Sequence, residues 1–244
     1  MNYIKKLDDK LINQIAAGEV VDNPASIVKE LIENSIDAKS SNITVNISKG
    51  GIKEITVIDD GIGMSGDDLK MAFKRFATSK ISSKNDLFNI KTLGFRGEAL
   101  PSIASVSKLS ASSFNKNDSN IIEISGGKII SFKPSNITAG TKIIIKNIFF
   151  NVPARKKFLK KDSYEYGKIL KVFKTFALSN PHITFHLYNN NKCIYKLKST
   201  NTYNRLLEIF GKSYEGNILE IDLKQDCYHI KGFIGNLSIL KQRR

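Results

Sequence analysis

The sequence predicts an α+β fold, in which segments of helical periodicity and runs of short strands share one chain of 244 residues. Three observations carry this prediction: an amphipathic helix, a hairpin directly after it, and four strands in succession further along. The helix spans residues 24–37. Its residues Ile27, Leu31 and Ile32 share one side, which we expect to face the core, and Pro24 suits its first turn.

The hairpin occupies residues 43–58. Apolar Ile43, Val45 and Ile47 alternate with polar residues, which is typical of a half-buried strand. A Lys-Gly-Gly turn at 49–51 then leads into the strand EITVID. The hairpin therefore follows the helix with only a short connection.

The remaining elements follow from the same two periodicities. We expect helices at 8–17, 67–76, 98–106 and 154–178, and strands at 106–112, 121–125, 128–132, 141–146, 183–188 and 192–198. The pattern changes near Thr200, where a second module begins with a helix at 202–210 and strands at 217–223 and 228–234. The predicted domains are therefore 1–200 and 201–244.

The formal net charge is +15, which indicates a polyanionic partner such as nucleic acid. Only six of the 38 basic residues are arginine, so a compositional bias toward lysine explains the charge as well. The predicted helix at 154–178 carries Lys168, Lys171 and Lys174 on one side, a surface that we call the lysine face, and it begins with a basic run at 155–157. This surface is either an ordinary solvated face or a DNA-facing patch.

Cysteine and histidine positions indicate neither a disulfide framework nor a zinc site. Cys193 and Cys227 lie far apart without CxxC spacing, which fits a reduced intracellular protein. His182 and His186 are four residues apart, but they fall in a predicted strand. The N-terminus lacks the apolar core of a signal peptide, and no apolar run reaches the roughly 18 residues of a membrane span. We therefore expect a cytoplasmic chain with no membrane partner.

Glu30, Asn34 and Asp37 share a second side of the helix at 24–37, because they follow one another at helical spacing. A solvated polar face is one interpretation, since surface helices commonly carry acids. The other makes Glu30 a general base and Asn34 an oxygen ligand for a hard cation such as Mg²⁺.

Two glycine-containing motifs lie further along the chain. DDGIGM follows the second hairpin strand, so Asp59 could accept a hydrogen bond from the amino group of a base, although an ordinary Asp-Gly turn explains the same pattern. Gly94 and Gly97 precede the helix at 98–106, as in a loop whose amides point at an anion. ATSK, at 77–80, lies upstream of this loop across a polar segment.

The motifs together carry a resemblance that none carries alone. Their order is NQIAAGEV (13–20), KELIENSIDA (29–38), DDGIGM (59–64), ATSK (77–80), GFRGEAL (94–100), GT (140–141) and VPARKKFL (152–159). The set resembles the N-terminal ATPase region of the MutL family of DNA mismatch-repair proteins, within the wider GHKL superfamily, over nearly the whole chain. The resemblance implies a Bergerat fold: an α/β sandwich with a mixed, mostly antiparallel sheet, followed by the start of a second, ribosomal S5-like domain.

The resemblance also implies ATP and Mg²⁺ as ligands and a role for each matched residue. Glu30 activates the attacking water, Asn34 coordinates Mg²⁺, and Asp59 receives the adenine amino group. Gly63 lets the base approach, and Thr141 supports Asp59 and the base edge. The other nucleotide-binding residues are Asp37 on the helix and, in a lid over the phosphates, Thr78, Lys80, Gly94, Phe95, Arg96, Gly97 and Glu98.

Several features depart from the family pattern. Asp60 replaces the more usual asparagine of DNG, and Pro101 is uncommon after GEAL. A phosphate-binding lysine late in the family's second module and the C-terminal dimerisation region would lie beyond Arg244, so we expect a longer protein.

The implied partners are DNA, the mismatch-recognition protein MutS, and a second copy or paralogue in an ATP-dependent dimer. Two other readings stay open at this point: a type II topoisomerase-like GHKL ATPase, and a DNA-binding scaffold with a vestigial nucleotide pocket. A histidine kinase is disfavoured because no phospho-acceptor histidine helix is present.

Overall fold

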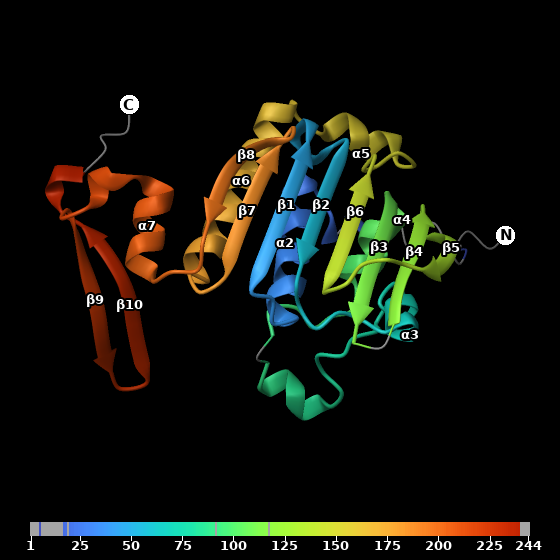
Figure 1. Ribbon diagram of the computed structural model, residues 1–244, viewed down its shortest axis with the longest axis horizontal. Helices are drawn as coiled ribbons and strands as arrows, with labels where there is room; N and C mark the ends of the chain where they lie inside the picture. Colours follow the sequence, from blue (N-terminus) through green and yellow to red (C-terminus); the bar gives the residue numbers. More distant parts are fainter. Residues whose placement is uncertain (1–4, 6–16, 19, 91, 117, 240–244) are drawn as a thin grey trace.

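The structure is a computed structural model that describes residues 5, 17–18, 20–90, 92–116 and 118–239 (Figure 1). Its α-helices are α2 (Pro24–Asp37), α3 (Gly66–Met71), α4 (Ala99–Ser105), α5 (Pro153–Phe158), α6 (Asp162–Ser179) and α7 (Thr202–Phe210). Its strands are β1 (Asn42–Ser48), β2 (Glu54–Asp59), β3 (Lys108–Asn115), β4 (Asp118–Ser125), β5 (Lys128–Pro134), β6 (Thr141–Lys146), β7 (Thr184–Asn189), β8 (Lys192–Leu197), β9 (Ile218–Gln225) and β10 (Tyr228–Gly235). Short 3-10 turns occur at η1 (Lys49–Gly51), η2 (Lys84–Phe88), η3 (Lys212–Tyr214) and η4 (Leu237–Ile239).

Eight strands form one mixed sheet in the order β5-β4-β3-β6-β2-β1-β7-β8. Strands β1 and β7 pair in parallel, and every other neighbouring pair in this sheet is antiparallel. The predicted α+β class with a mostly antiparallel sheet is therefore confirmed.

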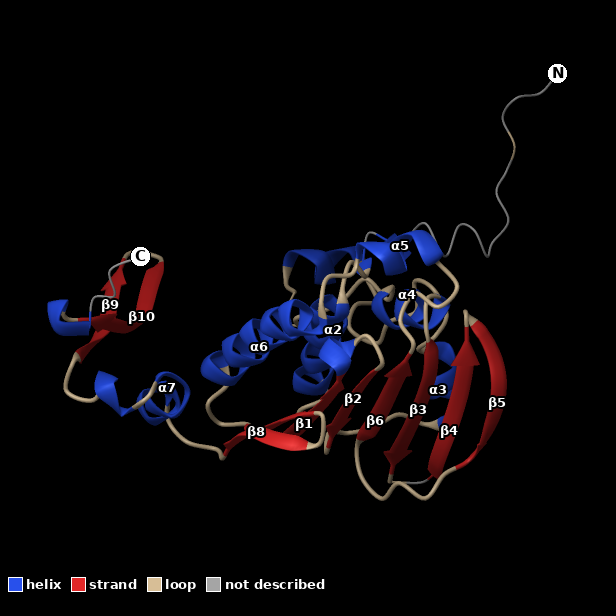
Figure 2. Ribbon diagram, turned by 90° about the horizontal axis from the view of Figure 1, so that it is seen from above, coloured by secondary structure: helices blue, strands red, loops and turns tan. Residues whose placement is uncertain are grey.

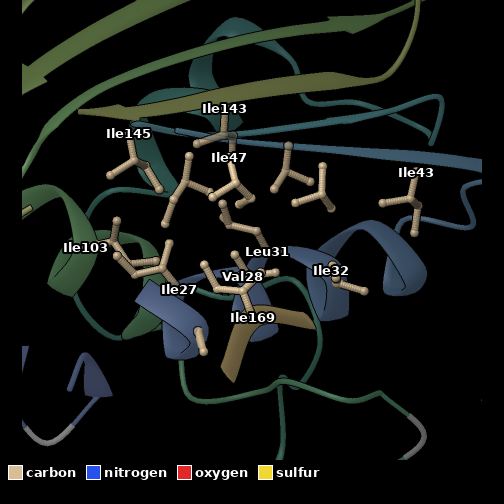
Figure 3. Packing of buried hydrophobic residues seen from close by; sticks show 14 of the residues in the cluster. Ile27, Val28, Leu31, Ile32, Ile43, Ile47, Ile103, Ile143, Ile145 and Ile169 are labelled. Atoms are coloured by element: carbon tan, nitrogen blue, oxygen red, sulfur yellow. The ribbon is translucent and has the colours of Figure 1, made fainter. Parts of the chain in front are cut away.

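Helices α2, α4 and α6 lie on one face of the large sheet (Figure 2). The core lies between this face and α2, whose Ile27 and Leu31 pack toward Ile47, Ile143 and Ile145 of the strands (Figure 3). These side chains are at most 7% exposed, so the apolar side of α2 predicted from periodicity is the buried one.

Helix α2 begins and ends where the sequence predicts. The Asn23 side chain caps it by accepting hydrogen bonds from the amides of Ala25 and Ser26, and Pro24 occupies the first turn. The apolar side of α2 packs on the sheet, while its polar residues contact the end of β2 and the segment after α3: Ser35 bonds to Asp59, and Asn34 and Asp37 bond to Lys80.

Two predicted helices are wrong in extent. The helix expected at 67–76 ends at Met71, and the chain turns until Phe76, which has φ +60° and donates its amide hydrogen to the Gly97 carbonyl. The helix expected at 154–178 is split into α5 and α6. The Glu165 carboxylate accepts the amide of Lys160 at 3.0 Å, which stabilises the break between the two helices.

The segment after Thr200 contains α7 and a separate two-stranded sheet of β9 and β10. Helix α7 is tied to the main body by Arg205, whose fully buried guanidinium donates to the carbonyl oxygens of Ala177, Pro181, Ile183 and Lys198. The helix predicted at 8–17 lies outside the described residues except for its last position. None of the helices described is both long and apolar enough to cross a membrane.

Candidate active site

The polar side of α2 meets the segment 77–98, which we call the lid segment. Lys80 reaches α2 from this segment: its Nζ lies 2.9 Å from Asn34 Oδ1 and 2.6 Å from Asp37 Oδ2. Asp37 also accepts hydrogen bonds from the amides of Leu93 and Gly94, at 3.0 and 3.3 Å. The structure therefore brings together residues that lie 43 to 57 positions apart in the chain.

Both ends of the lid segment are joined at Gly97. Its φ is +62°, and a Cβ atom there would lie 2.5 Å from the carbonyl oxygen of Ala77. The neighbouring amide of Phe76 bonds to the Gly97 carbonyl at 3.0 Å. Only glycine fits this close crossing of ATSK and GFRGEAL, which explains why the two motifs lie side by side.

The other predicted lid residues make local contacts. Thr78 Oγ1 accepts the amide of Lys80 at 3.1 Å. The Arg96 guanidinium lies 5.7 Å from the Phe95 ring centre, and Glu98 lies 3.6 Å from Arg75. Among the predicted lid residues, Lys80 and Gly94 thus donate hydrogen bonds to α2 in the described chain. Arg96 contacts Phe95 within the lid segment, and Glu98 contacts Arg75 just before it.

Glu30 lies one helical turn before Asn34, with a side chain that is 25% exposed. Lys29 Nζ bridges two carboxylates, 3.2 Å from Glu30 Oε1 and 2.9 Å from Glu33 Oε2. Burial raises the pKa of Glu33 above its usual value, against the opposing effect of Lys29. Glu30 is therefore the more accessible of the two acids, as a group that acts on water needs to be.

Asp59 ends β2 as a buried carboxylate, only 9% exposed. Ser35 Oγ donates to its Oδ2 at 2.9 Å from α2, and the Gly61 amide donates to its Oδ1 at 3.0 Å. Burial raises the pKa of Asp59, although these hydrogen bonds lower it in part. A buried acceptor oriented by two donors is suited to recognise a hydrogen-bond donor on a ligand.

Gly63 and Thr141 belong to the same corner. Gly63 has φ +67°, and a Cβ atom there would lie 1.8 Å from the carbonyl oxygen of Phe114, so the fold itself requires glycine. Thr141 is the register partner of Asp59 between β6 and β2, and its hydroxyl lies 2.8 Å from Ser113 Oγ.

Sequence reasoning missed Ser35 and Ser113. Ser113 Oγ accepts the Met64 amide at 2.8 Å and thereby ties the DDGIGM loop to β3. Ser35 follows Asn34 directly, so its position between the apolar and polar sides of α2 was a usable signal.

Asp60 has a different role from Asp59. Its carboxylate accepts the amides of Ser41 and Asn42 at 2.7 and 2.8 Å, and the Asn42 side chain at 2.6 Å. Partial burial opposes ionisation, but these donors outweigh it and hold the pKa of Asp60 below its usual value. Asp60 therefore braces the start of β1.

The side-chain oxygens of α2 that face Lys80, Asn34 Oδ1 and Asp37 Oδ2, are of the kind that a hard divalent cation prefers. Asn34 Oδ1 already binds a positive charge, the ammonium of Lys80, at 2.9 Å. Within the described ranges no group of three or more His, Cys, Asp or Glu side chains could hold a metal ion. A cation here would consequently need ligands from the bound substrate as well as from the protein, which is how Mg²⁺ commonly binds with phosphates.

The lysine face lies on α6. Lys168 lies 3.6 Å from Glu165 and 4.9 Å from the Tyr164 ring centre, and Lys174 lies 5.6 Å from the ring centre of Tyr195. Lys171 is exposed.

Comparison with known proteins identifies this arrangement. Residues 22–151, more than half of the chain, match the profile described as "Histidine kinase-, DNA gyrase B-, and HSP90-like ATPase". The chain belongs to this ATPase family. The matched range contains α2, DDGIGM, the lid segment and Thr141, which are the elements of the corner described above.

Relatives place the chain beside the MutL members of the ATPase family. It is 44% identical over 244 residues to the DNA mismatch repair protein MutL of Parabacteroides distasonis, covering 99% of this chain and 40% of that protein. It is 46% identical over 236 residues to MutL of Caldanaerobacter subterraneus subsp. tengcongensis, covering 96% and 40%. The predicted resemblance to MutL is thereby confirmed, and the chain spans about two fifths of the length of these relatives.

A solved structure of a MutL ATPase domain is similar to this chain in fold. The Aquifex aeolicus MutL ATPase domain complexed with ADP is 33% identical, with a TM-score of 0.63, and the match covers 78% of this chain and 70% of that one. The similarity thus includes a MutL domain that holds an adenine nucleotide.

Proposed function

We propose that the chain is the ATP-binding and ATP-hydrolysing region of a MutL-type mismatch repair protein. One observation carries the proposal: the buried carboxylate of Asp59 and the polar side of α2 are joined by the 2.9 Å hydrogen bond from Ser35. An acceptor for a base and oxygen groups for a phosphate-bound cation are therefore held on one rigid unit.

In this proposal Asp59 accepts the amino group of adenine, and Thr141 and Gly63 shape the pocket around the base. Glu30, a helical turn from Asn34, orients water and takes its proton. Asn34 holds Mg²⁺, which would supply neutralisation of phosphate charge when bound. An amide oxygen adds cation affinity without adding another negative charge beside the phosphates.

The lid segment supplies positive and dipolar groups in this proposal. Lys80 and the amide of Gly94 already lie at the polar side of α2, within reach of an anion bound there. Thr78, Phe95, Arg96, Gly97 and Glu98 belong to the same segment. A closed lid would exclude water other than the one held at Glu30.

The role of the whole protein extends the proposal. We infer an ATP-driven dimerisation switch that binds DNA through lysine–phosphate contacts and couples mismatch recognition by MutS to later repair. The two predicted domains, 1–200 and 201–244, fit this reading, with α7 docked through Arg205 as the connection. The MutL names of the relatives support it over a topoisomerase subunit.

Base selectivity tests the proposal. Adenine offers an amino donor where guanine offers a carbonyl acceptor. Asp59 should therefore favour a non-hydrolysable ATP analogue over its GTP counterpart by roughly 5- to 150-fold, because a mispaired buried acceptor costs about 1–3 kcal/mol. Asp59→Asn should weaken binding of the ATP analogue, whereas Asp67→Asn, at a side chain of α3 that is 99% exposed, should not. Equal affinity for both analogues would remove Asp59 from base recognition.

A further inference from the structure

An ion pair between the lid segment and α2 lies where the proposed function puts the phosphates and the cation. Lys80 Nζ lies 2.6 Å from Asp37 Oδ2 and 2.9 Å from Asn34 Oδ1. The Lys80 and Asp37 side chains are 19% and 9% exposed. The pair is therefore protected from much of the screening that weakens ion pairs on the surface.

The carboxylate of Asp37 binds the lid segment at two further points. Its Oδ1 accepts the Leu93 amide at 3.0 Å, and its Oδ2 accepts the Gly94 amide at 3.3 Å. An ammonium and two adjacent backbone amides are the donors that commonly bind a phosphate. Asp37 thus satisfies, from within the chain, the donors that an anionic ligand would need.

The ammonium of Lys80 also binds a group of α2 that the proposed function assigns to another ligand. It donates a hydrogen bond to Asn34 Oδ1, the oxygen proposed to hold the divalent cation. In the described structure the Lys80 ammonium therefore lies where the proposed function puts the cation, and the Asp37 carboxylate binds the donors proposed for the phosphates.

We propose that Asp37 is a positioning residue that holds the lid segment on α2 before nucleotide binds. Its carboxylate stands in for a phosphate, and Lys80 stands in for the cation at Asn34. The nature of the competing ligand rests on the proposed function. Because a phosphate and Asp37 compete for the same donors, Asp37 releases Lys80 and the two amides when nucleotide binds. The coupling is reciprocal, so the contact between Asp37 and the lid segment weakens nucleotide binding by the same factor by which nucleotide weakens that contact.

The first test uses the protein without nucleotide. Asp37→Asn preserves the side-chain size but removes the charge that binds Lys80, so the lid segment should be cleaved by trypsin at Lys84 and Arg96 about tenfold faster, as expected for loss of charge-assisted hydrogen bonds. Asp67→Asn is the matched control, because its carboxylate is 99% exposed on α3. Lys80→Gln breaks the same contact from the lid side and should give the same increase at Lys84.

The second test measures ADP affinity in the absence of Mg²⁺ by calorimetry. Asp37→Asn should bind ADP about tenfold more tightly than the unaltered protein, because the competing carboxylate charge is gone. Unchanged lid cleavage in both Asp37→Asn and Lys80→Gln overturns the proposal, and so does weaker ADP binding by Asp37→Asn. If the unaltered protein binds no adenine nucleotide, the proposed function fails, while the digestion result still decides the role of Asp37.

Discussion

Asp59 and Asp60 are neighbours in the chain, but their carboxylates lie in opposite environments. Asp59 is buried beneath α2, where desolvation raises its pKa. Asp60 lies at the surface, where donors from Ser41 and Asn42 outweigh desolvation and lower its pKa. Ionisation at neutral pH therefore costs stability at the first residue and adds stability at the second.

The pair predicts two opposite effects of pH on stability. The pKa of Asp59 is higher in the folded than in the unfolded chain, so its contribution to stability is complete below about pH 3.9 and is lost as the pH rises through the folded pKa. Asp59→Asn should consequently raise the melting temperature at pH 7, with a gain that shrinks on acidification. Asn fits here because Ser35 Oγ also lies 3.1 Å from the Leu31 carbonyl and can redirect its proton.

Asp60→Asn provides the comparison of opposite sign. Its folded pKa is depressed, so its contribution to stability is present above about pH 3.9 and is lost as the pH falls through the folded pKa. The substitution should lower the melting temperature at pH 7 and have no effect in strong acid. Melting curves of both variants from pH 3 to 7.5 check the pair, and parallel trends would refute the opposite environments.

Glu30→Ala should leave ATP binding intact and slow hydrolysis by about 10²–10⁴-fold, the usual loss when a general base is removed. Phosphate release and binding of a non-hydrolysable analogue separate the two effects. Glu33→Gln, which changes the buried acid on the same helix, is the comparison. A hydrolysis defect in Glu33→Gln but not in Glu30→Ala would reassign the base.

Arg205→Met should release α7 from the main body. The substitution leaves the carbonyl oxygens served by Arg205 without its donors, at a cost of roughly 3 kcal/mol or more in total. Limited chymotrypsin digestion, with cleavage mapped at Tyr203, should show the loosened connection. Lys212→Met, which removes an exposed positive charge after α7, should digest like the unaltered protein. Identical digestion of both variants would show that Arg205 does not hold α7.

DNA binding should weaken steeply with salt and show little sequence preference, because lysine–phosphate contacts release counterions. Lys171 is the residue of the lysine face to test first, since Lys168 and Lys174 already contact Glu165 and Tyr195. Lys171→Glu should lower affinity and reduce the salt slope by about one. Lys128→Glu, on exposed β5, is the matched charge reversal. Equal effects of the two would make the lysine face an ordinary solvated surface.

Local periodicity was enough to predict the parts of the fold that depend on neighbouring residues. Helix α2 agrees with its predicted limits because its cap, its proline and its apolar side are all encoded within one short segment. The hairpin of β1 and β2 agrees because alternation and a glycine turn are equally local. The ordered motifs also led to the correct family.

The tertiary structure alone decided the relationships between distant segments. No local pattern predicts that the Glu165 carboxylate stabilises a break before α6, or that Arg205, in an ordinary amphipathic helix, becomes fully buried against four carbonyl oxygens. The environment of Asp59 depends on Ser35, 24 residues away, and the contact of Lys80 with Asp37 spans 43 residues. Sequence determined the family and the residues that we propose for the chemistry, whereas packing determined their burial, partners and pKa values, because these depend on groups that only the folded chain brings together.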